Sequence, residues 1–230
     1  MHELFGERLY VFESWVDSSI VEENYSYNAW YCMQPYTIIF VGPQGSGKGT
    51  QIELLTKFLK SHDPTRRLID VQTGRRFRAL AMKGEGYTER KVHETLDTGV
   101  LQPLFLSVML WSDALHQHLD PDAHLLIDGF PRTIHEADVL ESALSFYRRE
   151  HLTVINLETD ESIVRERMVK RARQDDTDAS IEARLTWYRE ETLPVLNHYR
   201  SRPHTSVITC DGTRSIHEVH EEILHVLGLV

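Results

Sequence analysis

The stretch Tyr36–Gln51 reads YTIIFVGPQGSGKGTQ. Its first part, Tyr36–Val41, is the kind of apolar and β-branched run that forms a strand buried on both faces. A glycine-rich loop, Gly42–Gly47, follows directly, and after Lys48 the apolar side chains recur at three- and four-residue intervals, as in a helix. This order of strand, G-x-x-x-x-G-K loop and helix predicts a loop that binds phosphate groups.

Each part of this loop contributes to anion binding. The glycines let backbone N–H groups turn inward around a phosphate, and the following helix adds the positive end of its dipole. Lys48 supplies a point charge for the terminal phosphates. A hydroxyl usually follows this lysine directly and binds magnesium, but here Gly49 intervenes and the hydroxyl comes at Thr50. We therefore expect the metal to be held mainly by phosphate oxygens, water and acidic residues elsewhere.

Four further runs rich in β-forming residues follow along the chain. Stretches with helical spacing separate them, and this alternation predicts an α/β fold whose parallel sheet is covered on both faces. The four runs are Leu68–Gln72, His124–Ile127, Leu152–Leu157 and Thr205–Thr209.

The composition excludes several classes of protein. The net charge of −10, from 25 basic and 35 acidic residues, speaks against a general nucleic-acid binder. No apolar run approaches the roughly 20 residues of a membrane-spanning helix, and the first residues lack the pattern of a secretory signal. Cys32 and Cys210 provide neither a disulfide framework nor a Cys-x-x-Cys zinc motif, which indicates a reducing, cytoplasmic location.

Residues 1–32 differ from the rest of the chain. They carry a charge of −5 and hold eight of the 21 aromatic residues. We treat them as an N-terminal extension that precedes a domain of residues 33–230. Either translation begins naturally at Met33, or the extension forms an amphipathic helix that docks on the domain or on a partner. Its apolar face would consist of Phe5, Leu9, Phe12, Val16 and Ile20.

Five motifs in the right order resemble those of adenylate kinases and related nucleoside monophosphate kinases. They are GPQGSGKGTQ at residues 42–51, TGRRFR at 73–78, DGFPRT at 128–133, RQDD with RL within 173–185, and DGT at 211–213. DGFPRT matches the family pattern at every position. The resemblance covers residues 34–230, about 85% of the chain.

The resemblance implies a P-loop fold in three layers, with a five-stranded parallel sheet in the order 2-3-1-4-5 flanked by helices. A lobe of about residues 73–101 would bind the acceptor monophosphate. The lid would be reduced to about residues 171–173, because only Ala172 separates Arg171 from Arg173. The chain is thus similar to short-lid members, and no zinc-bearing lid is expected with these cysteines.

The activity that the resemblance implies is reversible phosphoryl transfer from ATP–Mg²⁺ to a nucleoside monophosphate, with AMP the first expectation and GMP or another monophosphate the alternative. We expect a monomer whose partners are these nucleotides, with no nucleic acid and no membrane. The implied ATP-binding residues are Gly45, Ser46, Gly47, Lys48, Gly49, Thr50 and, against the base, Arg167. The implied acceptor-binding residues are Thr73, Gly74, Arg78, Gly129, Arg132 and Glu136.

The implied catalytic residues surround the transferring phosphoryl group, where positive charge and positioning do most of the work. They are Lys48, Arg132, Arg171, Arg173 and Arg184, with Asp175 and Asp176 to orient the basic side chains. Asp128 would hold magnesium through water. For Asp176 a second role is open, since it could instead cap the helix that begins near Thr177.

Two departures from the family pattern leave alternatives open. Arg75 stands where the family has an aspartate that helps to hold magnesium-bound water. Glu136 replaces a glutamine that reads adenine; a carboxylate can only accept, so it would suit guanine or, instead, pair with Arg132 on the same helix. A nucleotide-binding module with weak or no kinase activity is therefore the alternative function.

Two further possibilities, a P-loop GTPase and a metal site built from histidines, find little support in the sequence. A P-loop GTPase is disfavoured because the chain lacks an N-K-x-D motif. The 13 histidines show no metal-ligand spacing, and we expect them at the surface.

Overall fold

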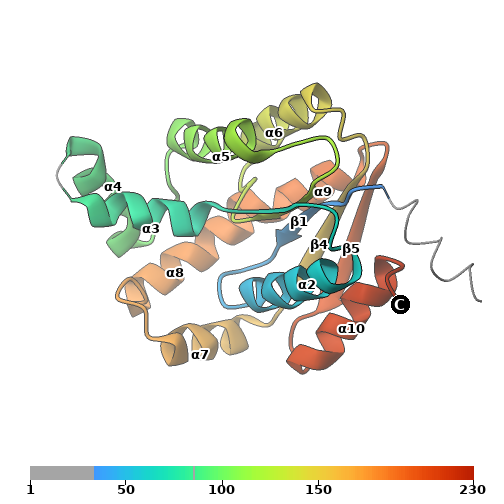
Figure 1. Ribbon diagram of the computed structural model, residues 1–230. Helices are drawn as coiled ribbons and strands as arrows, with labels where there is room; N and C mark the ends of the chain where they lie inside the picture. The colour runs from blue at the N-terminus through green and yellow to red at the C-terminus, as the bar shows by residue number, and fades with distance from the viewer. Residues whose placement is uncertain (1–33, 85) are drawn as a thin grey trace, which may run out of the picture. The chain divides into compact units, whose positions relative to one another are not determined.

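Five parallel strands form the centre of the computed structural model, which describes residues 34–84 and 86–230 (Figure 1). Their order is β2-β3-β1-β4-β5, which confirms the predicted sheet. The strands are β1 (Thr37–Val41), β2 (Leu68–Gln72), β3 (His124–Asp128), β4 (Leu152–Glu158) and β5 (Thr205–Asp211).

The register of the sheet brings the predicted motifs to one edge. On β1, Phe40 is aligned with Asp128 of β3 and with Ile155 of β4. On β2, Gln72 is aligned with the same Asp128, so the loop after β1 and the helix after β2 begin on either side of the end of β3. In open parallel sheets, ligands bind at this carboxyl edge, where the chain connections diverge to opposite sides.

Helices cover both faces of the sheet. On one face lie α2 (Lys48–His62) and α10 (Ile216–Val226), and on the other lie α5 (Leu104–His118), α6 (Ile134–Phe146) and α9 (Leu193–Arg200) (Figure 1). The side chains of β1 alternate between the two layers and are almost wholly buried, as the apolar run predicted. Burial on both faces explains why this strand shows no polar alternation.

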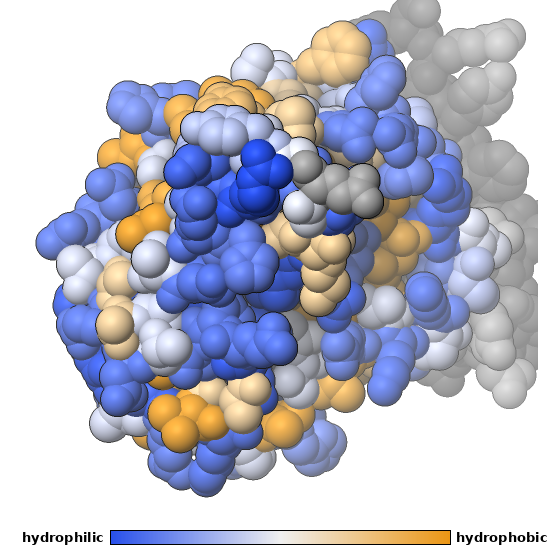
Figure 2. All heavy atoms as spheres, turned by 90° about the vertical axis from the view of Figure 1, so that its left-hand side faces the viewer, coloured by the Kyte–Doolittle hydropathy of each residue, from blue (hydrophilic) through white to orange (hydrophobic). Residues whose placement is uncertain are grey.

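A small helical lobe extends from the sheet and appears at the left of Figure 1. It consists of α3 (Thr73–Lys83) and α4 (Tyr87–Thr98), which pack on each other, while α3 also packs on α5. Phe77, Ala81, Val92 and Leu106 form its buried core. Figure 2 shows this side of the molecule, on which hydrophilic side chains predominate and hydrophobic ones form separate small patches.

The helices that follow β4 are α7 (Glu161–Arg171) and α8 (Asp178–Trp187). Residues 172–177 join them, and Ala172 ends α7 with a left-handed φ of 51°. After α8 the chain makes a π-helical turn, η1 (Tyr188–Thr192), and continues into α9. The helical stretch expected between the fourth and fifth strands is thus present, with one wider turn inside it.

The N-terminal extension of residues 1–32 lies outside the described residues, as does the choice between its two interpretations. In residues 34–84 and 86–230, no helix combines the length and the apolar character needed to cross a membrane.

Candidate active site

A cavity of about 580 Å³ opens at the carboxyl edge of the sheet. The glycine-rich loop forms one part of its wall, and Gly74, Asp128, Gly129 and Arg132 form another. Arg167, Arg171 and Arg173, from α7 and the connection after it, complete a wall that is rich in positive charge. The fold therefore brings together motifs that are as far apart as residues 42 and 173.

The glycine-rich loop has the backbone conformation that its sequence predicted. Gly45 has a φ of +93°, and a Cβ atom there would lie 2.9 Å from the carbonyl oxygen of Val164. Lys48 Nζ donates to the carbonyl oxygens of Gly42 (2.7 Å) and Pro43 (2.8 Å). Burial lowers the pKa of Lys48 to about 8, while the Asp128 carboxylate acts to raise it.

The DGFPR motif connects the acceptor lobe to the phosphate site. Gly129 has a φ of +87°, and a Cβ atom there would lie 2.6 Å from Oγ1 of Thr73. Thr73 Oγ1 donates to the Gly129 carbonyl oxygen (2.8 Å), and Arg132 Nε donates to the same oxygen (2.7 Å). One carbonyl group thus holds both the start of α3 and the guanidinium of Arg132.

A buried carboxylate organises the arginines behind this wall. The side chain of Asp176 is 0% exposed and binds Arg171 through two hydrogen bonds of 2.9 and 3.0 Å. Asp176 also accepts from Arg184 at 2.7 Å, and Arg184 in turn bonds the Asp175 carboxylate at 2.7 Å. Arg184 and the two aspartates lie behind the cavity rather than in its wall.

The alternative role for Asp176, the helix cap, is wrong. Thr177 caps α8 instead, in a capping box with Ser180, because its hydroxyl accepts from the Ser180 N–H while the Ser180 hydroxyl accepts from the Thr177 N–H. Asp176 is therefore free to bind the two arginines.

The chain shows clear similarity to known proteins. The family model for adenylate kinase matches residues 40–204, which is well over half of the chain. The chain belongs to the adenylate kinase family. An adenylate kinase of Corynebacterium aurimucosum is 37% identical over 193 residues, covering 83% of this chain and 98% of its own length. Adenylate kinase 1 of a Nostoc species is 35% identical over 191 residues, covering 83% and 98% respectively.

The donor side of the site must hold a nucleoside triphosphate. Here the Arg167 side chain links the glycine-rich loop to the loop after β5. Its Nη1 donates to the Gly212 carbonyl oxygen (2.8 Å) and contacts that of Ser46 (3.4 Å). Gly212 packs so closely that a Cβ atom would lie 2.3 Å from Oγ1 of Thr159. The DGT motif thus supports the phosphate loop and the arginine expected at the donor base.

Magnesium fits the residues present. Asp128 ends β3 at the cavity wall and is close enough to Lys48 to act on its pKa. Oxygen donors are what Mg²⁺ prefers, and it commonly binds through one or two carboxylates together with phosphates and water. Arg75, which replaces the family's aspartate, lies at the rim of the cavity, where its Nη2 pairs with Glu53 of α2 at 3.2 Å.

Glu136 is buried at 3% exposure and has several partners within the protein. Its Oε1 accepts from Ser107 Oγ (2.5 Å) and Trp111 Nε1 (3.2 Å), and its Oε2 accepts from the backbone N–H of Arg132 (2.7 Å). The alternative of a side-chain pairing with Arg132 on one helix is wrong, because Arg132 precedes α6 and offers its main chain. The sequence T-x-x-E at residues 133–136, a capping-box pattern, was the missed signal.

Glu136 nevertheless borders a space that could take a base. A smaller cavity of about 70 Å³ lies between the acceptor lobe and α6, and Glu136 lines it. Oε2 of Glu136 has one partner and so retains a lone pair. The other lining residues are Phe77, Leu101, Gln102, Leu104, Ser107, Gly129, Arg132 and Thr133.

Trp187 is the site residue that the sequence analysis missed most clearly. It lines the large cavity, and the Arg132 guanidinium carbon lies 4.8 Å from the centre of its ring. Its position three residues after Arg184, on the helix that carries a matched arginine, was the available signal.

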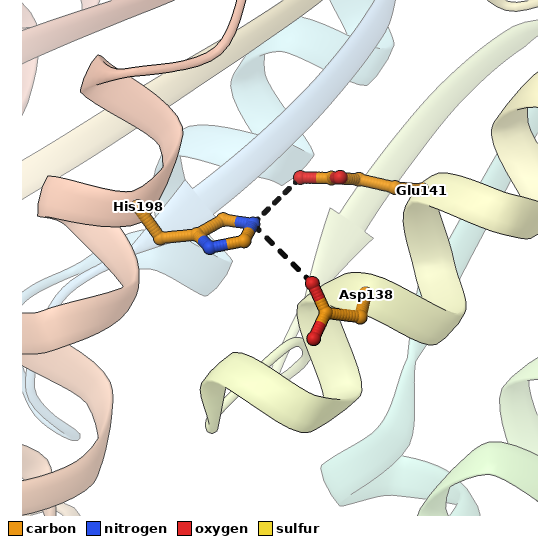
Figure 3. A group of neighbouring side chains, drawn as sticks. All are labelled: Asp138, Glu141 and His198. Carbon is orange, nitrogen blue, oxygen red and sulfur yellow. Dashed lines mark hydrogen bonds and ion pairs between the residues drawn. The ribbon is translucent and has the colours of Figure 1, made fainter.

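A second group of titratable side chains lies away from the cavity (Figure 3). His198 of α9 points between Glu141 and Asp138 of α6, at 2.7 and 3.9 Å. Arg202 Nε lies 3.1 Å from the Glu141 carboxylate and 3.3 Å from His198 Nε2, where a metal ion would have to sit. We interpret the group as an ion-pair cluster that ties α9 to α6.

The prediction that the histidines lie at the surface is wrong at two positions. The side chain of His198 is 11% exposed, and that of His124 is 1% exposed. His124 belongs to β3, where its ring accepts from the backbone N–H of Tyr36 and contacts Asp63.

Proposed function

We propose that the protein catalyses the reversible reaction ATP + AMP = 2 ADP. The observation that carries this proposal is the meeting of the phosphate-binding loop and the DGFPR arginine on one cavity whose wall also contains Arg171 and Arg173.

The chemistry requires charge and positioning rather than covalent work by the protein. A phosphate oxygen of AMP forms a bond to the γ-phosphorus of ATP as the bond to the ADP leaving group breaks, and negative charge spreads over the moving group. Lys48 and Arg132 both line the cavity in which this charge would develop. Asp128 would hold Mg²⁺ that binds with ATP, and the ion would neutralise part of the charge on the donor phosphates.

Several groups of the site are in place to bind the donor. The hydroxyl of Ser46 is buried in the glycine-rich loop and has no hydrogen-bond partner among the described residues, which suits a phosphate oxygen. Arg167 of α7 bridges the carbonyl groups of Ser46 and Gly212 and would lie along the base of ATP. The acceptor's phosphate would meet Arg78, whose guanidinium lies beside Gly74.

The acceptor base is the finer part of the proposal. AMP can give its 6-amino hydrogen to the remaining lone pair of Glu136, whereas GMP can give N1–H or its 2-amino group to the same atom. The relatives' names favour AMP. A coupled assay with ATP and each of AMP, GMP, CMP, UMP and dTMP tests the choice directly. AMP should have the highest kcat/KM, and a preference for another monophosphate would reassign the acceptor.

A nucleotide-binding module without transferase activity is the second candidate, and Arg75 is the observation that favours it. A cation stands where a magnesium-holding carboxylate is expected, although the Glu53 carboxylate, which lines the same cavity, pairs with it and compensates part of its charge. If ATP binds while no monophosphate is phosphorylated at any Mg²⁺ concentration, this second function replaces the first. Restoration of transfer by Arg75→Asp would identify the cause.

A further inference from the structure

Arg132 is held in an unusual way for a partly buried arginine. Its guanidinium donates through Nε to the Gly129 carbonyl oxygen and lies over the ring of Trp187. No carboxylate forms an ion pair with it among residues 34–84 and 86–230. Burial lowers its pKa, and the Glu136 and Asp128 carboxylates act in the opposite direction from outside contact distance. The positive charge of Arg132 is therefore not neutralised within the protein and is available to a ligand. The Gly129 carbonyl group and the Trp187 ring hold the guanidinium in position.

The π-helical turn allows two side chains, one on each side of it, to contact Arg132. Trp187 immediately precedes the turn and contacts the guanidinium, while Thr192 ends the turn and donates from Oγ1 to the Arg132 carbonyl oxygen at 3.0 Å. In a π-helix the i→i+5 hydrogen bonds bring residues five apart onto nearly the same face, whereas α-helical winding would separate them. The wider turn thus aligns both side chains on one target.

Trp187 also reaches the acceptor lobe. Its Nε1 donates to the carbonyl oxygen of Gly99, the residue that ends α4, at 3.0 Å. Gly99 has a φ of +71°, and a Cβ atom there would lie 2.5 Å from the carbonyl oxygen of Ser180 in α8. The end of the lobe therefore lies directly against the helix that carries Trp187.

We propose that Trp187 is a positioning residue that holds the guanidinium of Arg132 toward the transferring phosphate and couples it to the end of the acceptor lobe. This inference rests on the proposed function. The aromatic face of Trp187 holds the guanidinium, and the indole N–H bonds the acceptor lobe at Gly99. Different substitutions can therefore remove the two contacts separately. Stacking on an aromatic ring orients a guanidinium without neutralising it, which a carboxylate would do.

The experiment compares Trp187→Phe with Trp187→Leu in the full chain. Phe keeps an aromatic face but has no N–H, so kcat should stay within about twofold while the KM for AMP rises about fivefold, as for one lost hydrogen bond. Leu removes both contacts, and kcat should fall about tenfold as well. Phe146→Leu, which removes an aromatic ring that is 80% exposed at the end of α6, is the matched control and should change neither constant.

Three further measurements make the result decisive. If Trp187 acts through Arg132, then adding Trp187→Leu to Arg132→Ala should cost less than about twofold more in kcat, since coupled sites are not additive. A lower melting temperature for Trp187→Leu with unchanged kcat and KM would overturn the proposal, because Trp187 would then only pack. Calorimetric titration with AMP gives an answer without turnover: the Kd should rise several-fold for Leu, and an unchanged Kd would contradict the inference even if the wild type transfers no phosphate.

Discussion

Two pairs of cationic side chains serve this site, and the protein holds them in different ways. Among the residues that the structure describes, Lys48 and Arg132 bond only to main-chain carbonyl groups, apart from the aromatic contact of Arg132. Arg171 and Arg184 are both bound to the wholly buried carboxylate of Asp176. The first pair lines the cavity, whereas Arg184 of the second lies behind it.

The difference separates two tasks. A cation that bonds carbonyl oxygens keeps its full charge for the phosphates, but burial destabilises it, as the lowered pKa of Lys48 shows. A cation bonded to a buried carboxylate is fixed in place, but part of its charge is compensated. The first pair should therefore control rate with little effect on stability, and the second should affect stability together with rate.

Lys48→Met should give the largest loss of activity, and a small loss would contradict the distinction between the two pairs of cations. We expect kcat to fall by about 10²–10³-fold, because a charge that stabilises the transition state is lost. The melting temperature should not fall, since the substitution removes a buried charge. Steady-state kinetics and thermal unfolding measure both, and retention of more than about a tenth of wild-type kcat would rule out the role of Lys48.

Asp176→Asn should lower the stability of the protein as well as its rate, in contrast to Lys48→Met. The amide keeps one acceptor but loses the charge that binds Arg171 and Arg184, so the free energy of unfolding should fall by about 1.5–3 kcal/mol. The rate should fall with it as Arg171 loses its position. Asp178→Asn, two residues away at the exposed start of α8, is the control for charge alone. Equal unfolding free energies for Asp176→Asn and the wild type would show that the network is not structural.

Glu136→Gln tests a carboxylate that holds the main chain of Arg132 but not its guanidinium. If the amide oxygen accepts from Arg132, the amide NH₂ faces Trp111 Nε1–H, which then lacks an acceptor, at a cost of about 1–3 kcal/mol. Chemical denaturation should show this loss, whereas Glu141→Gln on the same helix should cost less. The AMP:GMP ratio of kcat/KM reports the second role: an unchanged ratio would mean that Glu136 does not read the base.

The pH dependence should give the smallest effect. Lys48 is charged below its pKa of about 8, so the kcat/KM for ATP should fall about tenfold for each pH unit above that value. Unfolding restores the ordinary pKa of 10.5, so the unfolded chain binds more protons between pH 8 and 10.5 and the free energy of unfolding should rise across that window. Lys48→Arg, which stays charged, should flatten the rate profile; a profile that keeps its slope would assign the titration elsewhere.

The strands and the phosphate-binding loop could be predicted because their signals are local. The apolar run before Gly42, the glycines and Lys48 lie next to one another in the sequence, and DGFPRT is a continuous match. The resemblance then gave the sheet order, which the structure confirms.

The resemblance implied that Asp176 orients the basic side chains but left a local role as a cap open, and the contacts with Arg171 and Arg184 decide between the two. The roles of Glu136 and Trp187 could not be predicted in the same way, because their partners come from other elements. The contact of Trp187 with Arg132 depends on a π-helical turn, which departs from regular helical periodicity by one residue.

The short connection between α7 and α8 has a consequence for the entropy of binding. Residues 172–177 are already tied at Asp176 and Thr177, so few backbone dihedrals there are left to be fixed when nucleotides bind. Each residue that a longer mobile segment would have to order costs about 1–2 kcal/mol of conformational entropy. The chain avoids that cost, and in exchange only side chains on this flank stand between bulk water and the reactive phosphorus. The ratio of ADP formed to ATP hydrolysed measures how well they exclude it.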